Sequence, residues 1–454
     1  MGSNLVPRYF HLDQTPIPKT GLHYGAVFEQ CLTWALKILG NPANPLFLAE
    51  IAHIILHCMT GRYRSFHTPE HVLQVVEGGD AIEVLAALFH DVVYIQVDTC
   101  IPPILQPLLD PLFTPGTGYF RRLKDLDELN KDPLFALVAS IFDIDREEEY
   151  IRQQNEFLSA IVAVHYLHPV LSRSVLAQVA ACIEATIPFR VSVDEGISPS
   201  DRLYHNLQQA NKRFDLNLTE EDVIGAVKRA VSLANRDVKN FADFKASHFL
   251  DNTWKLLPET NPALRNPQTY TSLQYRCALQ KMVGLMDFLQ PNLVFREFQG
   301  EPSLSEYQQM LDRAEKNIEV ARLYLKSKLV AIAFVEALNH PEREDTPLID
   351  LVGNVNLNPL SELEPFEASI SSRQAIIETE VMDLLEVGRS QETAFDIRHS
   401  PLATLLARTY GFEAINQWFE AAQSFFKDQI SHQAFLSIPP EDAVYLCIQH
   451  LQQH

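Results

Sequence analysis

Apolar residues recur at helical spacing along most of this chain, and this recurrence constrains the fold more than any other feature of the sequence. Segments 28–39 and 46–59 place apolar residues at positions i, i+3, i+4 and i+7, the pattern of an amphipathic helix. Residues 81–93 are almost all apolar and predict a helix that is buried on every side. No stretch alternates apolar and polar residues as a half-buried strand does, and no internal repeat is present. We therefore predict an all-α fold.

Proline-rich segments interrupt these helical patterns and suggest how the 454 residues are divided. Residues 99–118 carry five prolines and two glycines, so we expect a loop or lid there without regular helix. Residues 303–338 predict one or two long amphipathic helices. Residues 340–365 are rich in Pro, Asn and acidic residues and are the best candidate for a domain boundary. Residues 366–454 then form an appended helical module.

The charge balance argues against two broad classes of partner. Lys and Arg total 37 against 58 Asp and Glu, which gives a formal net charge of −21. A sequence-independent grip on nucleic acid needs a basic surface, and so does binding to anionic lipid. We therefore expect neither a nucleic-acid surface nor a membrane partner. A small anionic substrate stays open, because a bound metal ion can reverse the local field.

The cysteines and the N-terminal residues indicate the cellular compartment in which the protein works. The six cysteines include no Cys-x-x-Cys pair, so the sequence indicates neither a zinc ribbon nor a disulfide framework. The N-terminal residues match neither a signal peptide nor a myristoylation motif. The longest apolar runs fall far short of the ~20 residues that span a bilayer. We expect a cytoplasmic protein with reduced thiols.

Five residues form the pattern that most suggests chemistry: His67, His71, His90, Asp91 and Asp237. His67 and His71 are four residues apart and would project from one face of a helix. His90 and Asp91 end an apolar run, where burying an imidazole beside a carboxylate is costly unless a divalent metal ion binds both. Asp237 ends another helical pattern and would complete a set of two imidazoles and two carboxylates. By itself, Asp237 is equally typical of an exposed helical acid.

These segments resemble the motifs of the HD superfamily of metal-dependent phosphohydrolases, and within it the branch typified by cyclic-nucleotide phosphodiesterases. That branch has Tyr-His-Asn-x-x-His, an apolar helix ending in His-Asp, a helix with Ile-x-Ala-Thr, and Ala-Asp-x-x-Asn. The matching segments here are FHTPEH at 66–71, FHD at 89–91, CIEAT at 182–186 and RDVKN at 236–240. The resemblance implies an HD-type helical core over residues 50–245. The remaining expected segments are a helical lead-in at 1–49, a helical extension packed on the core at 246–340, and the C-terminal module at 366–454.

The resemblance also implies roles for individual residues. His71, His90, Asp91 and Asp237 would bind a divalent metal ion, and the sequence does not distinguish Mn, Mg, Fe and Zn. Asp91 would also bridge the metal ion and the nucleophilic water, whose pKa a metal ion lowers toward neutrality. His67 would be the general acid that protonates the leaving oxygen.

The chain departs from the phosphodiesterase motif after the His-Asp doublet. That branch continues with x-x-His-x-Gly, whereas this chain continues with VVYIQ at 92–96 and has no downstream His there. This departure argues against a two-metal site and against cyclic-nucleotide specificity, and the sequence leaves open whether one or two ions bind. Polar residues near the motifs are candidates for substrate binding: Arg62, Arg64, Arg190, Arg236 and Asn240.

These features predict metal-dependent hydrolysis of a phosphate ester or phosphodiester in a small phosphorylated molecule such as a nucleotide. The alternative is an HD-fold metal-binding scaffold that senses a ligand or binds a partner with little or no turnover. A third hypothesis is a di-iron oxygenase of the same fold. The apolar faces of residues 303–338 and 366–454 suit packing within the chain or a homodimer.

Overall fold

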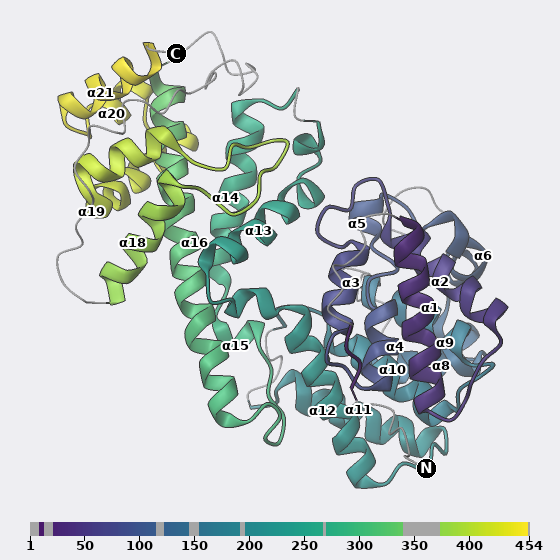
Figure 1. Cartoon of the computed structure of the whole chain (residues 1–454). Helices are drawn as coiled ribbons and strands as arrows, with labels where there is room; N and C mark the ends of the chain where they lie inside the picture. The colour runs from purple at the N-terminus through teal and green to yellow at the C-terminus, as the bar shows by residue number, and fades with distance from the viewer. Residues whose placement is uncertain are drawn as a thin grey trace. The chain divides into compact units, whose positions relative to one another are not determined.

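The computed structural model is built of helices and the segments that connect them (Figure 1). It describes residues 9–12, 21–114, 122–144, 154–190, 196–266, 269–338 and 373–452. Within these ranges no strand occurs, and the only bridges are isolated ones. None of the helices described combines the length and the apolarity that crossing a membrane requires. The prediction of an all-α fold is confirmed.

The chain divides into two compact units, the first of which contains Met1–Lys239 and Asn292–Gln309. Its α-helices are α1 (Gly21–Ile38), α2 (Pro45–Met59), α3 (Pro69–Val76), α4 (Ala81–Phe89), α5 (Ile95–Asp98), α6 (Gln106–Leu109), α7 (Leu126–Leu129), α8 (Pro133–Ile141), α9 (Gln154–Leu167), α10 (Arg173–Ala185), α11 (Pro199–Arg213) and α12 (Glu220–Asp237). The central helix is α4, which is buried along its whole length and contacts α1, α3, α9, α10 and α12. It begins with a capping box, in which the Asp80 and Glu83 side chains accept from each other's backbone N–H groups.

The second unit contains Asn240–Pro291 and Met310–His454. Its helices are α13 (Ala246–Thr260), α14 (Ser272–Phe288), α18 (Arg373–Glu386), α19 (Pro401–Phe426), α20 (His432–Leu436) and α21 (Glu441–Gln452), and the turns η3 (Lys239–Ala242) and η4 (Pro262–Arg265) also lie in or at the edge of this unit. The chain passes between the units in α15 (Pro291–Val294) and in α16 (Leu304–Leu338). Of the one or two long helices expected over 303–338, the structure has one, the 35-residue α16. Helix α19 is broken at Gly411, where φ is 77°, a conformation that suits glycine.

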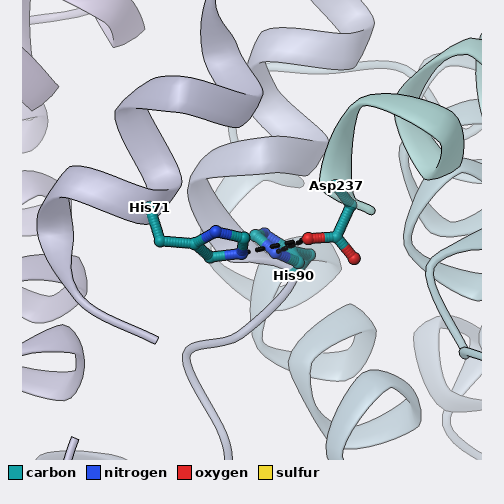
Figure 2. Close-up of side chains that lie close together, drawn as sticks. All are labelled: His71, His90 and Asp237. Atoms are coloured by element: carbon teal, nitrogen blue, oxygen red, sulfur yellow. Dashed lines mark ion pairs between the residues drawn. The ribbon is translucent and has the colours of Figure 1, made fainter. Parts of the chain in front are cut away.

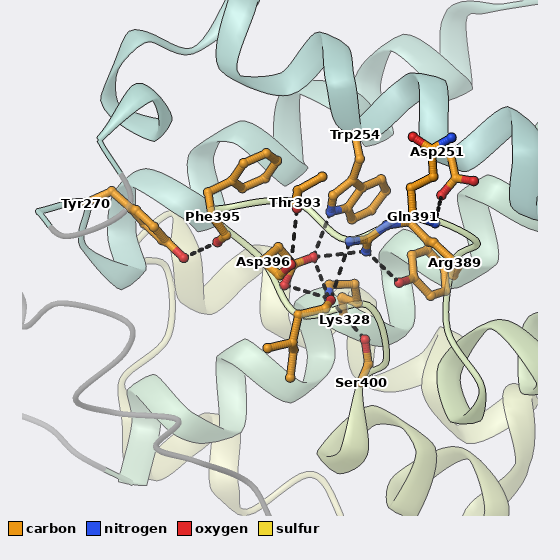
Figure 3. A network of polar contacts seen from close by, with 12 residues as sticks. Asp251, Trp254, Tyr270, Lys328, Arg389, Gln391, Thr393, Phe395, Asp396 and Ser400 are labelled. Carbon is orange, nitrogen blue, oxygen red and sulfur yellow. Dashed lines mark hydrogen bonds and ion pairs between the residues drawn. The ribbon is translucent and has the colours of Figure 1, made fainter. Parts of the chain in front are cut away.

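The second unit encloses a network of charged and polar side chains (Figure 3). Asp396 accepts a hydrogen bond from Trp254 Nε1 at 2.6 Å. The same carboxylate lies 3.2 Å from Lys328 Nζ and 3.1 Å from Arg389 Nη1. Lys328 also donates to Ser400 Oγ at 3.0 Å. The network joins α13, α16 and the segment between α18 and α19. Each buried charge in it is stabilised only by its bonded partners, so the loss of one partner would leave an uncompensated buried charge.

The grouping of the helices differs from the segments expected from the sequence. Helix α1, in the expected lead-in 1–49, packs against α2 and α4 as part of the core of the first unit. Residues 292–309 belong to the first unit, while the rest of 246–338 groups with 373–452 in the second. A periodic sequence shows that a helix has an apolar face but not which other helix covers it. The boundary expected at 340–365 lies outside the described residues.

The proline-rich segment 99–118 is more regular than expected over the part that the structure describes, which ends at residue 114. It forms the short turns η1 (Pro103–Leu105), α6 and η2 (Asp110–Leu112). Each turn has a proline at its first or second position, where the missing N–H leaves no helical hydrogen bond unmade. The prolines of this segment therefore start helical turns, contrary to the expectation that they would prevent them.

Candidate metal centre

The histidine pair lies at the start of α3. This helix begins at Pro69, so His71 lies in its first turn, whereas His67 precedes the helix. The expectation that both histidines project from one helix is therefore wrong. The reason is Pro69, because a proline disfavours the helical conformation in the residue before it. The buried His71 ring lies against the Phe66 ring, with the centroids 4.7 Å apart.

His90 follows directly on α4 as its C-cap residue. Its Nδ1 lies 2.8 Å from the carbonyl oxygen of Ala87. A carbonyl oxygen only accepts, so Nδ1 carries the proton and Nε2 carries the lone pair when the ring is neutral. Metal-binding histidines commonly have this arrangement, since the hydrogen bond fixes both the tautomer and the orientation of the ring.

The turn after His-Asp is held by α9. The Val93 N–H donates to Ser159 Oγ and the Ile95 N–H donates to Asn155 Oδ1, both at 3.1 Å. Because these backbone groups bond to α9, the helix expected over 81–93 ends at Phe89. The sequence analysis did not single out Asn155 or Ser159. Two polar residues at helical spacing at the start of an apolar helix are the signal that could have revealed them.

Asp237 is the last residue of α12 and meets both histidines. His71 Nε2 lies 3.0 Å from Asp237 Oδ1, and His90 Nε2 lies 2.9 Å from Asp91 Oδ2. The cross distances are 3.6 Å from His71 Nε2 to Asp91 Oδ2 and 3.5 Å from His90 Nε2 to Asp237 Oδ1. Figure 2 shows the His71 and His90 rings directed toward the Asp237 carboxylate. The structure therefore brings together all four residues that the sequence suggested as metal ligands.

The donor atoms fit a single divalent ion. Ligands about 2.1 Å from an ion are about 3.0 Å apart at adjacent octahedral positions and about 3.4 Å apart in a tetrahedron. The observed separations of 2.9 to 3.6 Å fall around these values. Nε2 of both histidines is shielded from solvent and makes no hydrogen bond among the described residues. The ligand atoms of His71, His90 and Asp237 all lie within 4.8 Å of one another, so these three residues could hold one ion. Asp91 adjoins this group through its contacts with both histidines.

The electrostatics of the site favour positive charge between the carboxylates. Burial lowers the pKa of His90, but the Asp91 and Asp237 carboxylates raise that pKa well above its ordinary value. Burial raises the pKa of Asp91, but His90 and His67 bring it well below its usual range. Burial also raises the pKa of Asp237, and His71 and His90 more than reverse that effect. Both acids are therefore ionised at neutral pH.

His67, the expected general acid, lies beside the four ligands. Its ring centroid is 5.7 Å from that of His71 and 4.6 Å from that of Tyr94, with the Tyr94 contact edge to face. The imidazole is close enough to Asp91 to lower the pKa of that carboxyl group. His67 is half-buried, whereas His71 and His90 are buried. It is thus the most accessible imidazole of the three.

Arg64, a candidate substrate contact, is buried and bonded within the protein. Nε and Nη2 donate to the Asp98 carboxylate at 3.0 and 2.6 Å. Nη1 donates to the backbone carbonyl of Asp91 at 2.7 Å. Arg64 therefore stabilises the backbone at Asp91, a candidate metal ligand, and its N–H donors face the protein interior.

The other candidates for substrate binding have different surroundings. Arg62 is exposed and lies over the Tyr63 ring. The Arg236 guanidinium bonds to the Glu83 carboxylate at 2.8 Å and to the Val75 carbonyl, so it ties α12 to α3 and α4. Asn240 lies in η3, which the structure groups with the second unit and does not place relative to the ligands.

Arg190 is the candidate that lies in a charged group near the site. It pairs with the Glu184 carboxylate and donates to the Glu184 carbonyl at 2.8 Å. Glu156, in the first turn of α9, is a further acid that the sequence analysis missed. Burial and the two ligand carboxylates raise the pKa of Glu156 to about 7, although Arg190 acts in the opposite direction. An acid at the head of the apolar run 157–164 was the available signal for it.

Comparison with known proteins leaves the family unassigned. No protein-family model matches the chain, and no significant match to a curated protein or to a solved structure was found.

Proposed function

We propose that this protein is a metal-dependent hydrolase of the HD type that cleaves a phosphate ester or phosphodiester in a small molecule such as a nucleotide. The observation that carries the proposal is the convergence of His71 Nε2, His90 Nε2 and an Asp237 carboxylate oxygen within 4.8 Å of one another. Asp91 Oδ2 lies beside both histidines and is the fourth proposed ligand. The order of these residues along the chain is also the order of the HD motifs that the sequence resembles.

Each residue has a role that follows from its surroundings. His90 offers Nε2 as a ligand, because the Ala87 carbonyl holds the proton on Nδ1. Asp91 and Asp237 stay ionised and balance the charge of the ion. When bound, the ion would stabilise the charge that develops on phosphorus and lower the pKa of a water molecule. His67 lies outside the proposed ligand set, beside His71, and would donate a proton to the leaving oxygen.

The test combines metal content with turnover. Purified protein loaded with Mn²⁺ should contain one equivalent of metal and hydrolyse bis-p-nitrophenyl phosphate. Asp91→Ala and Asp237→Ala should lose both metal and activity. His67→Ala should keep its metal while its rate falls by about 10²- to 10⁴-fold, the usual contribution of a general acid. The matched control is His165→Ala, which removes an exposed histidine of α9 and should change neither quantity.

Other results would favour the alternatives. One equivalent of metal without turnover over a panel of phosphomonoesters and diesters would support the ligand-sensing or partner-binding scaffold. Two equivalents of iron with redox-dependent spectra would support the di-iron oxygenase. Loss of activity in Asp91→Ala with full retention of metal would contradict the proposed ligand set. The expected homodimer and cytoplasmic location stay predictions.

A further inference from the structure

Arg296 is attached to the same helix that carries Asp237. Asn235, two residues before Asp237 on α12, is buried and bonds to the Arg296 backbone in both directions. The Arg296 N–H donates to Asn235 Oδ1 at 2.8 Å, and Asn235 Nδ2 donates to the Arg296 carbonyl at 2.9 Å. This paired contact fixes the position of Arg296 at the end of α12 that forms the candidate metal centre.

The Arg296 side chain extends from there to the end of α10. Its Nη2 donates to the Ile187 carbonyl at 2.5 Å. Arg190 lies in the same short segment after α10 and is tied to Glu184, the penultimate residue of that helix. Two guanidinium groups thus meet at the C-terminal end of α10, within the first unit.

Among the described residues, one carboxylate forms an ion pair with these two guanidinium groups. Glu184 pairs with Arg190, and no ion pair of Arg296 occurs among the residues that the structure describes. Arg296 Nη1 and Arg190 Nε are shielded from solvent and have no hydrogen-bond partner there. Burial and the nearby charges of Arg190 and Arg202 lower the pKa of Arg296 to about 10. Burying an N–H donor of a charged group away from water destabilises the fold unless an acceptor forms a hydrogen bond with that N–H.

The arginine pair is close to the metal centre through two structural links. The Arg296 backbone bonds to Asn235, two residues before the candidate ligand Asp237. Helix α10, at whose end the two guanidinium groups meet, packs directly against α12, which ends at Asp237. A molecule that reaches the metal centre with one phosphoryl group could place a second anionic group at the arginines.

We infer that Arg190 and Arg296 form an anion subsite beside the metal centre, and that the substrate carries a second phosphoryl group which binds there. This inference rests on the proposed function for the identity of the first phosphoryl group. Planar guanidinium groups with free N–H donors are well suited to phosphate oxygens. The substrate class is therefore a small molecule with two phosphoryl groups, such as a nucleoside diphosphate, in preference to a simple monoester or diester.

Binding of inorganic pyrophosphate to the full-length, metal-free protein tests the subsite without any need for turnover. Equilibrium dialysis in EDTA should detect binding to the wild type, and Arg296→Met should weaken it by about 10- to 100-fold, the loss expected for hydrogen bonds to a charged group. Arg296→Met keeps the backbone contacts with Asn235, and Arg296→Lys, which retains the charge, should lie between the two. Arg213→Met removes an exposed arginine in the last turn of α11 and serves as the matched control.

Kinetics of the Mn²⁺-loaded protein separate the subsite from the proposed reaction. Arg296→Met should raise KM for a nucleoside diphosphate by a similar factor and leave kcat/KM for bis-p-nitrophenyl phosphate within about twofold, because the diester has no second phosphoryl group. If no hydrolysis is found but pyrophosphate binds and Arg296→Met weakens that binding, the proposed function is rejected and the subsite is supported. Equal pyrophosphate binding by the wild type and Arg296→Met, or no binding by the wild type, would overturn the subsite even if hydrolysis is found.

Discussion

Replacing Arg64 by Met tests how the first unit holds the His-Asp turn. The Arg64 side chain is fully buried, and its partner Asp98 has a side chain only 10% exposed. Met has similar length and no charge, so the variant leaves the Asp98 carboxylate without its cation and the Asp91 carbonyl without its donor. Removing one partner of a buried ion pair costs about 3–5 kcal/mol. We expect the unfolding free energy of the first unit to fall by this amount.

Urea denaturation followed by circular dichroism measures the loss, and hydrogen-exchange mass spectrometry on α4 peptides assigns it to the first unit. Arg62→Met is the matched control, because it removes an exposed arginine two positions away and should change the stability by less than about 0.5 kcal/mol. The double variant Arg64→Met, Asp98→Asn should regain part of the loss, since neither partner is then left as an uncompensated charge.

Two results would refute this reasoning. The first is an Arg64→Met protein within about 1 kcal/mol of the wild type, the range of a solvated surface pair. The second is a double variant less stable than Arg64→Met, because that would show no coupling between the two side chains. A raised KM with unchanged stability would instead make Arg64 the substrate contact suggested by the sequence.

Three further predictions concern metal binding, pH and thiols. Mn²⁺ at 100 times its Kd should stabilise the first unit by about 2.7 kcal/mol, and Asp237→Ala should abolish this gain in a thermal-shift or urea experiment. Burial raises the pKa of Asp396, but Lys328 and Arg389 bring it below its ordinary value, so its ionised form stabilises the fold above the unfolded pKa. The second unit should therefore lose stability as pH falls below about 4. In urea denaturation, Asp396→Asn should be less stable than the wild type at pH 7, and its unfolding free energy should decrease less as the pH is lowered. Native protein should react with a thiol reagent at the exposed Cys100 and Cys277 only, and rapid labelling of a third cysteine would contradict the described packing.

The sequence predicted the helices better than it predicted their ends. The apolar pattern of residues 81–93 correctly indicated a buried helix, but it could not show that Asn155 and Ser159 would take the N–H groups of Val93 and Ile95 and end the helix early. Similarly, hydrophobic periodicity does not show which distant side chain competes for a backbone donor. Contacts between residues 60 or more positions apart belong to tertiary structure.

The candidate site divides in the same way. His71, His90, Asp91 and Asp237 could be selected from sequence because their residue types and order carry a pattern that metal chemistry explains. Arg64 stood close to that pattern and was therefore taken as a substrate contact, although its donors bond to Asp98 and to a backbone carbonyl. The position of a residue along the chain does not show where its side chain points. The sequence therefore could not show that Arg64 bonds within the protein instead of contacting a substrate.

The sequence by itself determined the all-α class and suggested which residues to propose as metal ligands, because both depend on residue type and spacing along one chain. Only the tertiary structure decided that His71, His90 and Asp237 come together and that Arg296 reaches the end of α10. These outcomes depend on how helices from separate parts of the chain pack, and packing is set by the shapes of many apolar faces together. The same dependence explains why Arg296 gave no signal in the sequence: its place is fixed by Asn235, a residue 61 positions earlier.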